Sequence, residues 1–457
     1  MRKKVIALTL CIMMLSGLAA CGKATDKQGA GSEGDTTTKE STEVSATEGE
    51  IEIPIILNTG TNDALDMEWG EVVEAFNEEY AGKYRIEVEK LAGAAEDYRQ
   101  KIKMLNSAES LPSILFGMGT EPAFLDLLIN NDRLVDIEQY MAADANWTSH
   151  LMPQAIEEFK TDKGTFLVPV TGVQMAGVYY NKELFEEAGI NGFPETWEDF
   201  LKACEDLKGA GITPISLHTM ETAWCGMLAA TANMAATETG RKFLEEQFPS
   251  SYDNQEFRDS MEMMVKLFKD YSTEDAVGGS YALASNHFFA GNTAMIPNGP
   301  WMMESLTDTS YAEEGFENKV GYAAFPGNAM QGFLGQQAMA ISKDHPQEVI
   351  DGAIEFVKFY HQPEYILRAA EKTGSMPTAV ELEKETIEKM ILPMQEYVEC
   401  AKNVDIIFPN YQNKWDPIAQ QDIFGRELPN LIYESIDMDE FITMLDEGAA
   451  QYQLDIE

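Results

Sequence analysis

The sequence predicts an α/β protein built of two lobes, and three observations support this. Predicted strands alternate with predicted helices from Ile51 onward, an order that produces sheets covered by helices. The stretch from Ile51 to Glu457 is globular in composition and exceeds the usual size of one hydrophobic core. Neither an internal repeat nor a coiled-coil heptad is present. We therefore expect two α/β lobes, each around a mainly parallel sheet.

The first unit follows the order β-α-β-α-β. Alternating apolar residues predict strands, and apolar residues three or four apart predict helices. The predicted elements are a strand over 51–57, a helix over 69–80, a strand over 84–88, a helix over 98–105 and a strand over 114–116. Pro122 is well placed to open the next helix. Ligands of open α/β sheets bind beyond the carboxyl ends of such strands.

A second unit of the same kind begins near Gly164. Strands are predicted at 168–170, at 178–180 and at 212–217, and a helix runs from Lys182 until Gly189 ends it. Thr196, with Asp199 three residues later, is placed to cap a helix over 197–207.

The N-terminus resembles a bacterial lipoprotein signal. Arg2-Lys3-Lys4 precedes an apolar run that closes on Leu18-Ala19-Ala20-Cys21, and this run is too short to remain as a membrane-spanning helix. The resemblance implies removal of residues 1–20 and lipidation of Cys21, which would anchor the protein to the membrane on its extracytoplasmic face. An ordinary secretory signal with a chance cysteine is the alternative. Residues 21–50 lack the apolar content for a core and are expected to form a disordered tether.

Composition excludes several classes of function. The formal net charge of −44 disfavours nucleic acid as a partner. The five histidines are scattered and no HExxH, GxSxG, CxxC or Walker pattern occurs, so no metal, cofactor or catalytic residue is predicted. Cys204, Cys225 and Cys400 allow at most one disulfide within the exported chain. Cys204 lies on the apolar face of its helix and is expected to be a buried, inert thiol.

Five motifs occur in series along the chain. They are Gly164-Thr165-Phe166-Leu167-Val168-Pro169, Tyr180-Asn181-Lys182 with Leu184 to Ile190, Pro194 to Phe200, Phe289 to Met295 with Asn298-Gly299-Pro300-Trp301, and Gly335 to Ser342. Together they resemble the family 1 extracellular solute-binding proteins, the sugar-capturing subunits of ABC importers. The resemblance implies a two-lobe periplasmic-binding-protein-like fold of type II, hinged by crossover strands, with the ligand in a cleft between the lobes. It also implies a monomer that is not an enzyme and that delivers its ligand to the membrane subunits of an ABC permease.

The resemblance further implies discontinuous domains. Crossovers are expected near 165–169, near 334–338 and around Leu392. The first lobe would comprise residues 51–163 with about 338–390, and the second would comprise residues 164–337 with about 391–457.

Aromatic plates and hydrogen-bonding side chains are the groups that a sugar site needs. Trp301 matches a family position that stacks on sugar rings, and Trp415 resembles a second plate; for both, a place in the core is the alternative. Trp224 is expected to be core more often than ligand contact. The polar candidates follow predicted strands or match ligand-facing positions of the family. They are Asn58, Gly60, Glu121, Gln174, Glu221 and Gln336.

None of these candidates is Lys or Arg, whereas anionic ligands favour a guanidinium or a helix N-terminus. A neutral sugar or oligosaccharide is therefore the expected ligand. Two other functions stay open on the sequence: a lipid-anchored glycoside hydrolase, which needs two suitably spaced carboxyl groups, and a binding protein that reports to a sensor kinase.

Overall fold

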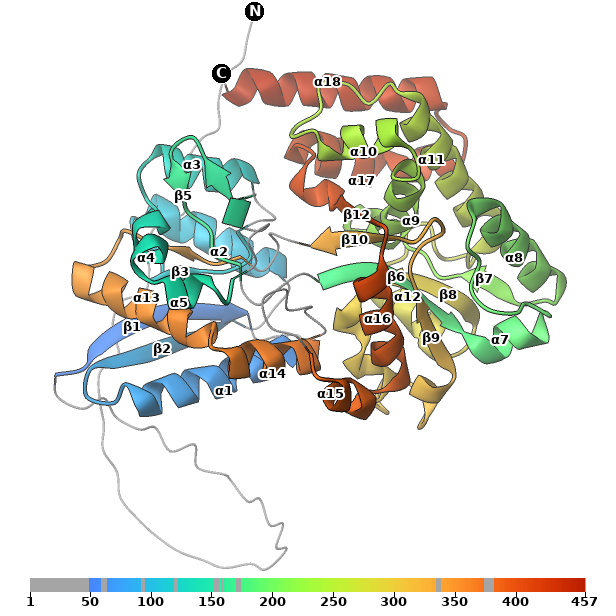
Figure 1. Cartoon of the computed structure of the whole chain (residues 1–457). Helices are drawn as coiled ribbons and strands as arrows, with labels where there is room; N and C mark the ends of the chain where they lie inside the picture. Colours follow the sequence, from blue (N-terminus) through green and yellow to red (C-terminus); the bar gives the residue numbers. More distant parts are fainter. Residues whose placement is uncertain are drawn as a thin grey trace, which may run out of the picture. The chain divides into compact units, whose positions relative to one another are not determined.

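The structure of the chain is a computed structural model (Figure 1). It describes residues 49–58, 64–91, 95–118, 122–151, 156–157, 159–169, 174–333, 338–373 and 382–456. The predicted signal peptide, Cys21 and nearly all of the predicted tether lie outside these residues. Residues 46–457 form one compact unit, in which the described residues build a four-stranded sheet, a six-stranded sheet and a two-stranded hairpin.

The first sheet has four strands in the order β11-β3-β1-β2. Its strands are β1 (Ile51–Asn58), β2 (Tyr84–Leu91), β3 (Ile114–Leu115) and β11 (Ala340–Ile341). β1 pairs in parallel with β2 and β3, whereas β11 runs antiparallel to β3. The predicted strands at 51–57, 84–88 and 114–116 are confirmed, and Ile53, Ile55 and Leu57 are buried in the core, as alternation along a strand requires.

Helices from distant parts of the chain complete this first region. The helices are α1 (Ala64–Glu79), α2 (Ala95–Ser107), α3 (Pro122–Asn130), α4 (Glu138–Ala143), α5 (Ala145–Thr148), α13 (Gln347–Tyr360) and α14 (Pro363–Thr373), and a short hairpin is formed by β4 (Lys160–Thr161) and β5 (Gly164–Thr165). In Figure 1 the late helix α13 lies beside β1. Gly352 permits this approach, because a Cβ there would lie 2.6 Å from Cδ1 of Ile53. Trp69 of α1 stacks on Tyr360 of α13 at 4.4 Å.

The second sheet has six strands and is mixed. Its path is β12-β10-β6-β8-β7, and β9 also pairs with β6. The strands are β6 (Gln174–Asn181), β7 (Thr213–Ile215), β8 (Thr293–Asn298), β9 (Val320–Ala323), β10 (Ala329–Phe333) and β12 (Ile406–Pro409). β6 runs antiparallel to β8, β9 and β10, so the predicted mainly parallel arrangement is wrong for this sheet. Apolar runs indicate which strands are buried but do not encode the direction in which the chain enters a sheet.

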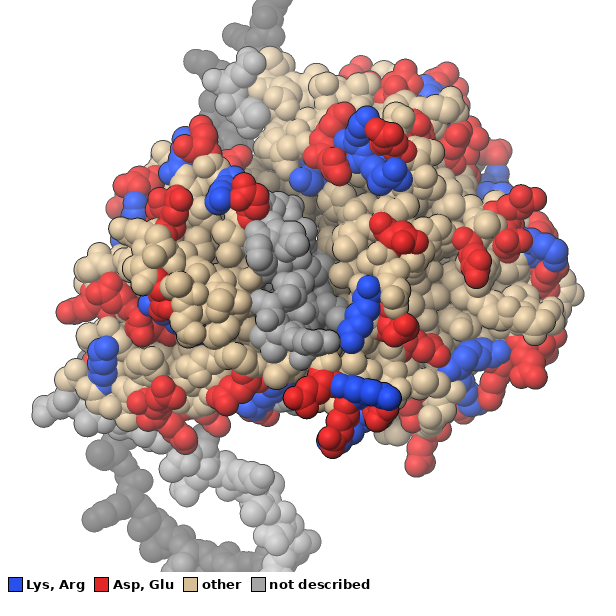
Figure 2. All heavy atoms as spheres, viewed as in Figure 1, with Lys and Arg blue, Asp and Glu red and all other residues tan. Residues whose placement is uncertain are grey.

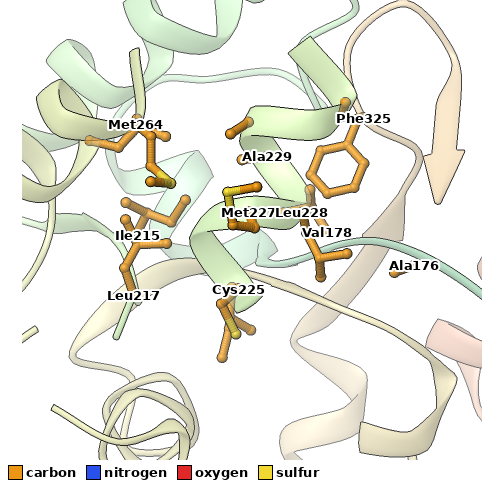
Figure 3. Close-up of a cluster of buried hydrophobic side chains, with 14 of the residues drawn as sticks. Ala176, Val178, Ile215, Leu217, Cys225, Met227, Leu228, Ala229, Met264 and Phe325 are labelled. Atoms are coloured by element: carbon orange, nitrogen blue, oxygen red, sulfur yellow. The ribbon is translucent and has the colours of Figure 1, made fainter. Parts of the chain in front are cut away.

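A mostly apolar helix passes through the core beside this sheet. α9 (Trp224–Met234), whose polar residues are Thr231 and Asn233, is buried along almost its whole length, as expected for a helix without a charged face. Figure 3 shows Met227, Leu228 and Ala229 of α9 among Ile215 and Met264 from neighbouring elements. The other helices of this region are α7 (Lys182–Glu187), α8 (Trp197–Gly209), α10 (Glu238–Glu245), α11 (Gln255–Lys266), α12 (Tyr281–Phe289), α15 (Lys384–Lys389), α16 (Leu392–Asn403), α17 (Gly425–Ile432) and α18 (Met438–Ile456).

The first expected crossover pairs with the residue that directly follows the second, of which the structure describes residue 338. The backbone N–H groups of Val168 and Met339 each donate to the carbonyl oxygen of the other residue, at 2.9 and 2.8 Å. The third crossover, expected around Leu392, stays a prediction; Leu392 begins α16, a helix that packs on β9 of the second sheet. The lobe boundaries stay a proposal.

The predicted cap of α8 is confirmed. Thr196 Oγ1 accepts the backbone N–H of Asp199 at 3.1 Å and donates to its carboxylate at 2.7 Å. Cys204 is fully buried on this helix, also as predicted, and burial raises the pKa of its thiol to about 12. Cys204, Cys225 and Cys400 are all free thiols. Among the described helices, none combines the length and the hydropathy needed to span a bilayer.

Candidate functional site

A cavity of about 710 Å³ brings together four of the predicted site residues. Gln174, Glu221, Trp224 and Trp301 all line it. They come from the start of β6, from the turn before α9, from the first residue of α9 and from the short helix Pro300–Met302. Residues more than a hundred positions apart therefore meet at one place.

One corner of the cavity is aromatic. The ring centroids of Trp224 and Trp301 lie 6.1 Å apart with an angle of 59° between the planes, and Tyr281 packs on Trp224 at 4.8 Å. Both tryptophans are half-buried. Gly299 makes room for Trp301, since a Cβ at this position would lie 2.1 Å from the indole ring. The corner offers apolar surface that faces the cavity.

The other walls carry primary amides. The amide side chains that line the cavity are Gln174, Gln331, Asn410, Gln412, Gln420 and Gln421. Several are held by other protein groups: Gln331 Nε2 donates to Thr231 Oγ1 at 3.1 Å, and Gln420 Nε2 donates to the carbonyl of Gln412 at 3.2 Å. Because an amide both donates and accepts, this wall can bind groups such as hydroxyls in either orientation.

Sequence reasoning missed most of this amide wall. Gln420 and Gln421 lie on a π-helix, Ile418–Phe424, and a π-helical turn leaves no reliable periodic pattern in a sequence. Asn410 and Gln412 were detectable in principle, because they lie within three residues of the end of strand β12, and polar residues at the carboxyl end of a strand favour a ligand site.

Charge in the lining comes from Glu221 and from Arg99 of α2. The Glu221 carboxylate accepts the backbone N–H of Tyr281 at 2.8 Å, through Oε2. Arg99 was not among the predicted residues, and it adds one basic group to a site that the sequence predicted without any. The other lining residues that the structure describes are uncharged.

A buried histidine packs against the aromatic corner of the cavity. His218 packs edge-on against Trp224 at 5.5 Å, and its Nδ1 lies 2.8 Å from the carbonyl oxygen of Met220. A carbonyl only accepts, so the Nδ1 atom carries the proton. Burial lowers the pKa of His218, although the Met220 carbonyl and Glu221 act in the opposite direction.

Trp415 does not line this cavity. Its side chain is 1% exposed and packs edge-on against Tyr252 at 4.8 Å and Tyr411 at 5.1 Å. The structure therefore corrects its place from ligand plate to core. An aromatic residue after a polar segment has the same appearance in a sequence in either setting. Trp415 still supports the site, because Tyr411 is itself a lining residue.

The remaining candidates are not placed in the site. The backbone of Asn58 ends β1. Gly60, Glu121 and Gln336 lie outside the described residues.

A second cavity of about 470 Å³ shares Asn410 with the first. Its lining is richer in apolar side chains, such as Leu125, Phe166 and Ile407, and holds neither of the half-buried tryptophans. For a ligand that needs both aromatic and polar contacts, the first cavity is therefore the better candidate.

Within the described part of the chain, no group of three His, Cys, Asp or Glu side chains is arranged to hold a metal ion. Acidic side chains are spread over the face shown in Figure 2 and are more frequent there than basic ones.

Comparison with known proteins agrees with this fold. Over 266 residues the chain is 26% identical to the multiple sugar-binding protein of Streptococcus mutans serotype c, an alignment that covers 56% of this chain and 61% of that protein. The chain therefore spans less than two thirds of that curated relative's length.

Solved structures match over a larger share of the chain. A chitin oligosaccharide binding protein has a TM-score of 0.73 at 19% identity, covering 88% of this chain and 98% of that one. A Streptococcus pneumoniae solute-binding protein in complex with the blood group A-trisaccharide has a TM-score of 0.70 at 18% identity, covering 87% and 99%. At these identities the likeness establishes the α/β solute-binding fold.

The family assignment rests on the sequence itself as well as on the fold. Residues 71–389 match the family described as bacterial extracellular solute-binding protein. This match includes three of the strands and helices that position the cavity, namely β6, α9 and β8. The chain belongs to the bacterial extracellular solute-binding proteins, which bind their solutes and are not enzymes.

Proposed function

We propose that this protein captures a neutral sugar or oligosaccharide outside the cytoplasm and delivers it intact to an ABC-type permease. The observation that carries the proposal is one cavity in which the Trp224–Trp301 corner faces walls rich in primary amides. Sugars present apolar C–H faces and a rim of hydroxyls, and this cavity offers a matching group for each.

The charge of the lining favours an uncharged ligand. Glu221 would repel an anionic ligand, and among the described lining residues Arg99 is the one that offers the guanidinium that a carboxylate or phosphate prefers. The Glu221 oxygen Oε1 is the one not engaged by Tyr281 in the bond described above, and it is suited to accept a sugar hydroxyl. The similar proteins named above have names or titles that describe sugar or oligosaccharide binding, and they support the same ligand class.

Capture would be coupled to movement of the two proposed lobes. Arg99 belongs to the first proposed lobe, whereas Trp224 and Trp301 belong to the second. A ligand that contacts both lobes lowers the free energy of the closed form relative to the open form, by no more than its difference in affinity for the two. The permease would then recognise the closed, loaded protein.

Lipidation of Cys21 would keep this binding protein at the membrane. Residues 21–50 would serve as a flexible tether on the extracytoplasmic face, and the protein would act as a monomer beside its permease. A Cys21→Ser variant should move from the membrane fraction to the medium and should no longer incorporate labelled fatty acid. Unchanged membrane association of this variant would contradict lipid anchoring.

A thermal-shift screen tests the ligand class. Maltotriose, xylotriose, raffinose and chitotriose would be compared with sn-glycerol 3-phosphate and glucuronate as anions. A ligand that binds only the native state raises the melting temperature by mass action, so at least one neutral glycan should raise it while the anions do not. Recovery of the glycan unchanged separates capture from hydrolysis. Stabilisation by the anions alone would overturn the proposal.

Trp301→Ala gives the residue-level test. Loss of stacking should weaken the binding of the active glycan by about tenfold, which corresponds to roughly 1.4 kcal/mol. Trp197→Ala is the matched control, because Trp197 is also half-buried but packs on Phe200 and Phe325 and does not line the cavity. Equal losses in the two variants, measured by calorimetry, would count against a role of Trp301 in the site.

A further inference from the structure

Three consecutive residues at the edge of the cavity adopt left-handed backbone. Glu221, Thr222 and Ala223 have φ angles of 54°, 61° and 53°. Residues with side chains visit this region singly, because the Cβ atom crowds the following carbonyl oxygen, and a run of three is unusual. Thr222 is also β-branched, which makes the conformation harder to adopt. Such a turn persists only where surrounding contacts hold it.

Those contacts come chiefly from the segment after β12. The Tyr411 hydroxyl lies 2.9 Å from the carbonyl oxygen of Thr222 and 3.0 Å from its Oγ1, and it donates to this pair. Gln412 Nε2 donates to Thr222 Oγ1 at 3.2 Å. At the other end of the turn, Glu221 is held by the backbone N–H of Tyr281. The left-handed turn is therefore fixed from two sides.

The residues that the turn carries are lining residues of the cavity. Glu221 and Thr222 are part of the turn, and Trp224 follows it directly as the first residue of α9. The backbone N–H of Ala223 donates to the carbonyl of Met220 at 3.0 Å, which closes the turn. If the turn relaxed to ordinary backbone, both the Glu221 carboxylate and the Trp224 ring would change place relative to Trp301.

We infer that Tyr411 is a positioning residue: its hydroxyl holds Thr222 and with it the left-handed turn at 221–223, and the turn fixes Glu221 and Trp224 in the wall of the cavity. The inference rests on the proposed function only for the nature of the ligand. The geometry can be tested without any ligand.

The test uses the full chain and the variant Tyr411→Phe. This change removes the hydroxyl that holds Thr222 but keeps the ring that packs against Trp415 and Phe424. Hydrogen exchange of the amides at 222–225 should become about tenfold faster, because local opening governs exchange. The near-ultraviolet circular dichroism of the Trp224–Trp301 pair, defined as the signal lost in Trp301→Phe, should fall by at least about half as the pair separates.

Tyr252→Phe is the matched control. Tyr252 is fully buried and also packs on Trp415, and its hydroxyl has no hydrogen-bond partner in the described part of the chain. This variant should leave both signals unchanged. A loss of equal size in Tyr252→Phe and Tyr411→Phe would show a general effect on packing and would overturn the inference.

Glycine should rescue the turn. In the double variant Tyr411→Phe with Thr222→Gly, the central residue adopts left-handed backbone without crowding, so slow exchange and the tryptophan signal should return toward wild type. Failure of this rescue, or wild-type signals in Tyr411→Phe alone, would overturn the inference. If the screen finds no glycan while the loss and its rescue are both observed, the proposed ligand is wrong and the positioning role stands.

Discussion

Trp301 and Trp415 show at the level of single residues how burial separates two side chains that the sequence treats alike. Trp301 is half-buried at the cavity, whereas Trp415 is 1% exposed in the core. Truncating a fully buried tryptophan costs about 3–5 kcal/mol of stability. Trp415→Ala should therefore lower the urea midpoint far more than Trp301→Ala does. Similar midpoints for the two variants would contradict the core assignment.

His218 predicts a pH dependence of stability. Burial lowers its pKa in the folded state, so below about pH 6.5 the unfolded chain binds a proton that the folded chain resists. The free energy of unfolding should thus fall as the pH drops from 7 to 5, by at most about 1.4 kcal/mol per pH unit from this group.

The variant His218→Gln isolates that contribution. It removes the titrating ring, so its unfolding free energy, measured in urea at each pH, should fall less steeply than that of the wild type. The carboxylates titrate in both proteins and cancel in the comparison. Parallel pH profiles for the two proteins would show that His218 is not the source of the slope.

Helix α8 tests the sequence rules at the level of elements. Thr196 and Asp199 were expected to cap it and do so. Thr196→Ala should cost about 1 kcal/mol, the usual value of an N-cap, seen as a lower melting temperature. Thr443 provides a control, since its exposed hydroxyl donates to the carbonyl of Asp439 within α18. A Thr443→Ala variant that loses as much stability as Thr196→Ala would remove the special role of the cap.

Other elements could not be derived in the same local way. The three left-handed residues at 221–223 include no glycine, so their sequence does not predict the turn. No sequence pattern predicts the π-helix that carries Gln420 and Gln421 either. The turn depends on a contact between segments almost two hundred residues apart, that between Tyr411 and Thr222, and the π-helix packs on α17 and α18. Local propensity cannot report a conformation that distant contacts impose.

The net charge of −44 acts at the scale of the whole molecule. Self-repulsion opposes the compact state, and raising the ionic strength from 0.01 to 0.15 M shortens the screening length from about 30 to about 8 Å. We expect the melting temperature to rise over this range of NaCl, measured by calorimetry without sugar. A fall would mean that screening of favourable pairs, such as Arg133 with Asp344, outweighs the relief of repulsion.

The sequence by itself determined the α/β class, three strands of the first sheet (β1, β2 and β3) with the helices between them, the cap of α8 and the family, because periodicity, capping residues and motifs are local properties of the chain. It also identified Gln174, Glu221, Trp224 and Trp301 as candidates before their meeting place was known. The tertiary structure alone decided the mixed direction of the second sheet, the burial of Trp415 and the joining of the amide wall to the tryptophan corner. These properties depend on which distant segments come into contact, and burial and strand direction are fixed only when those contacts form.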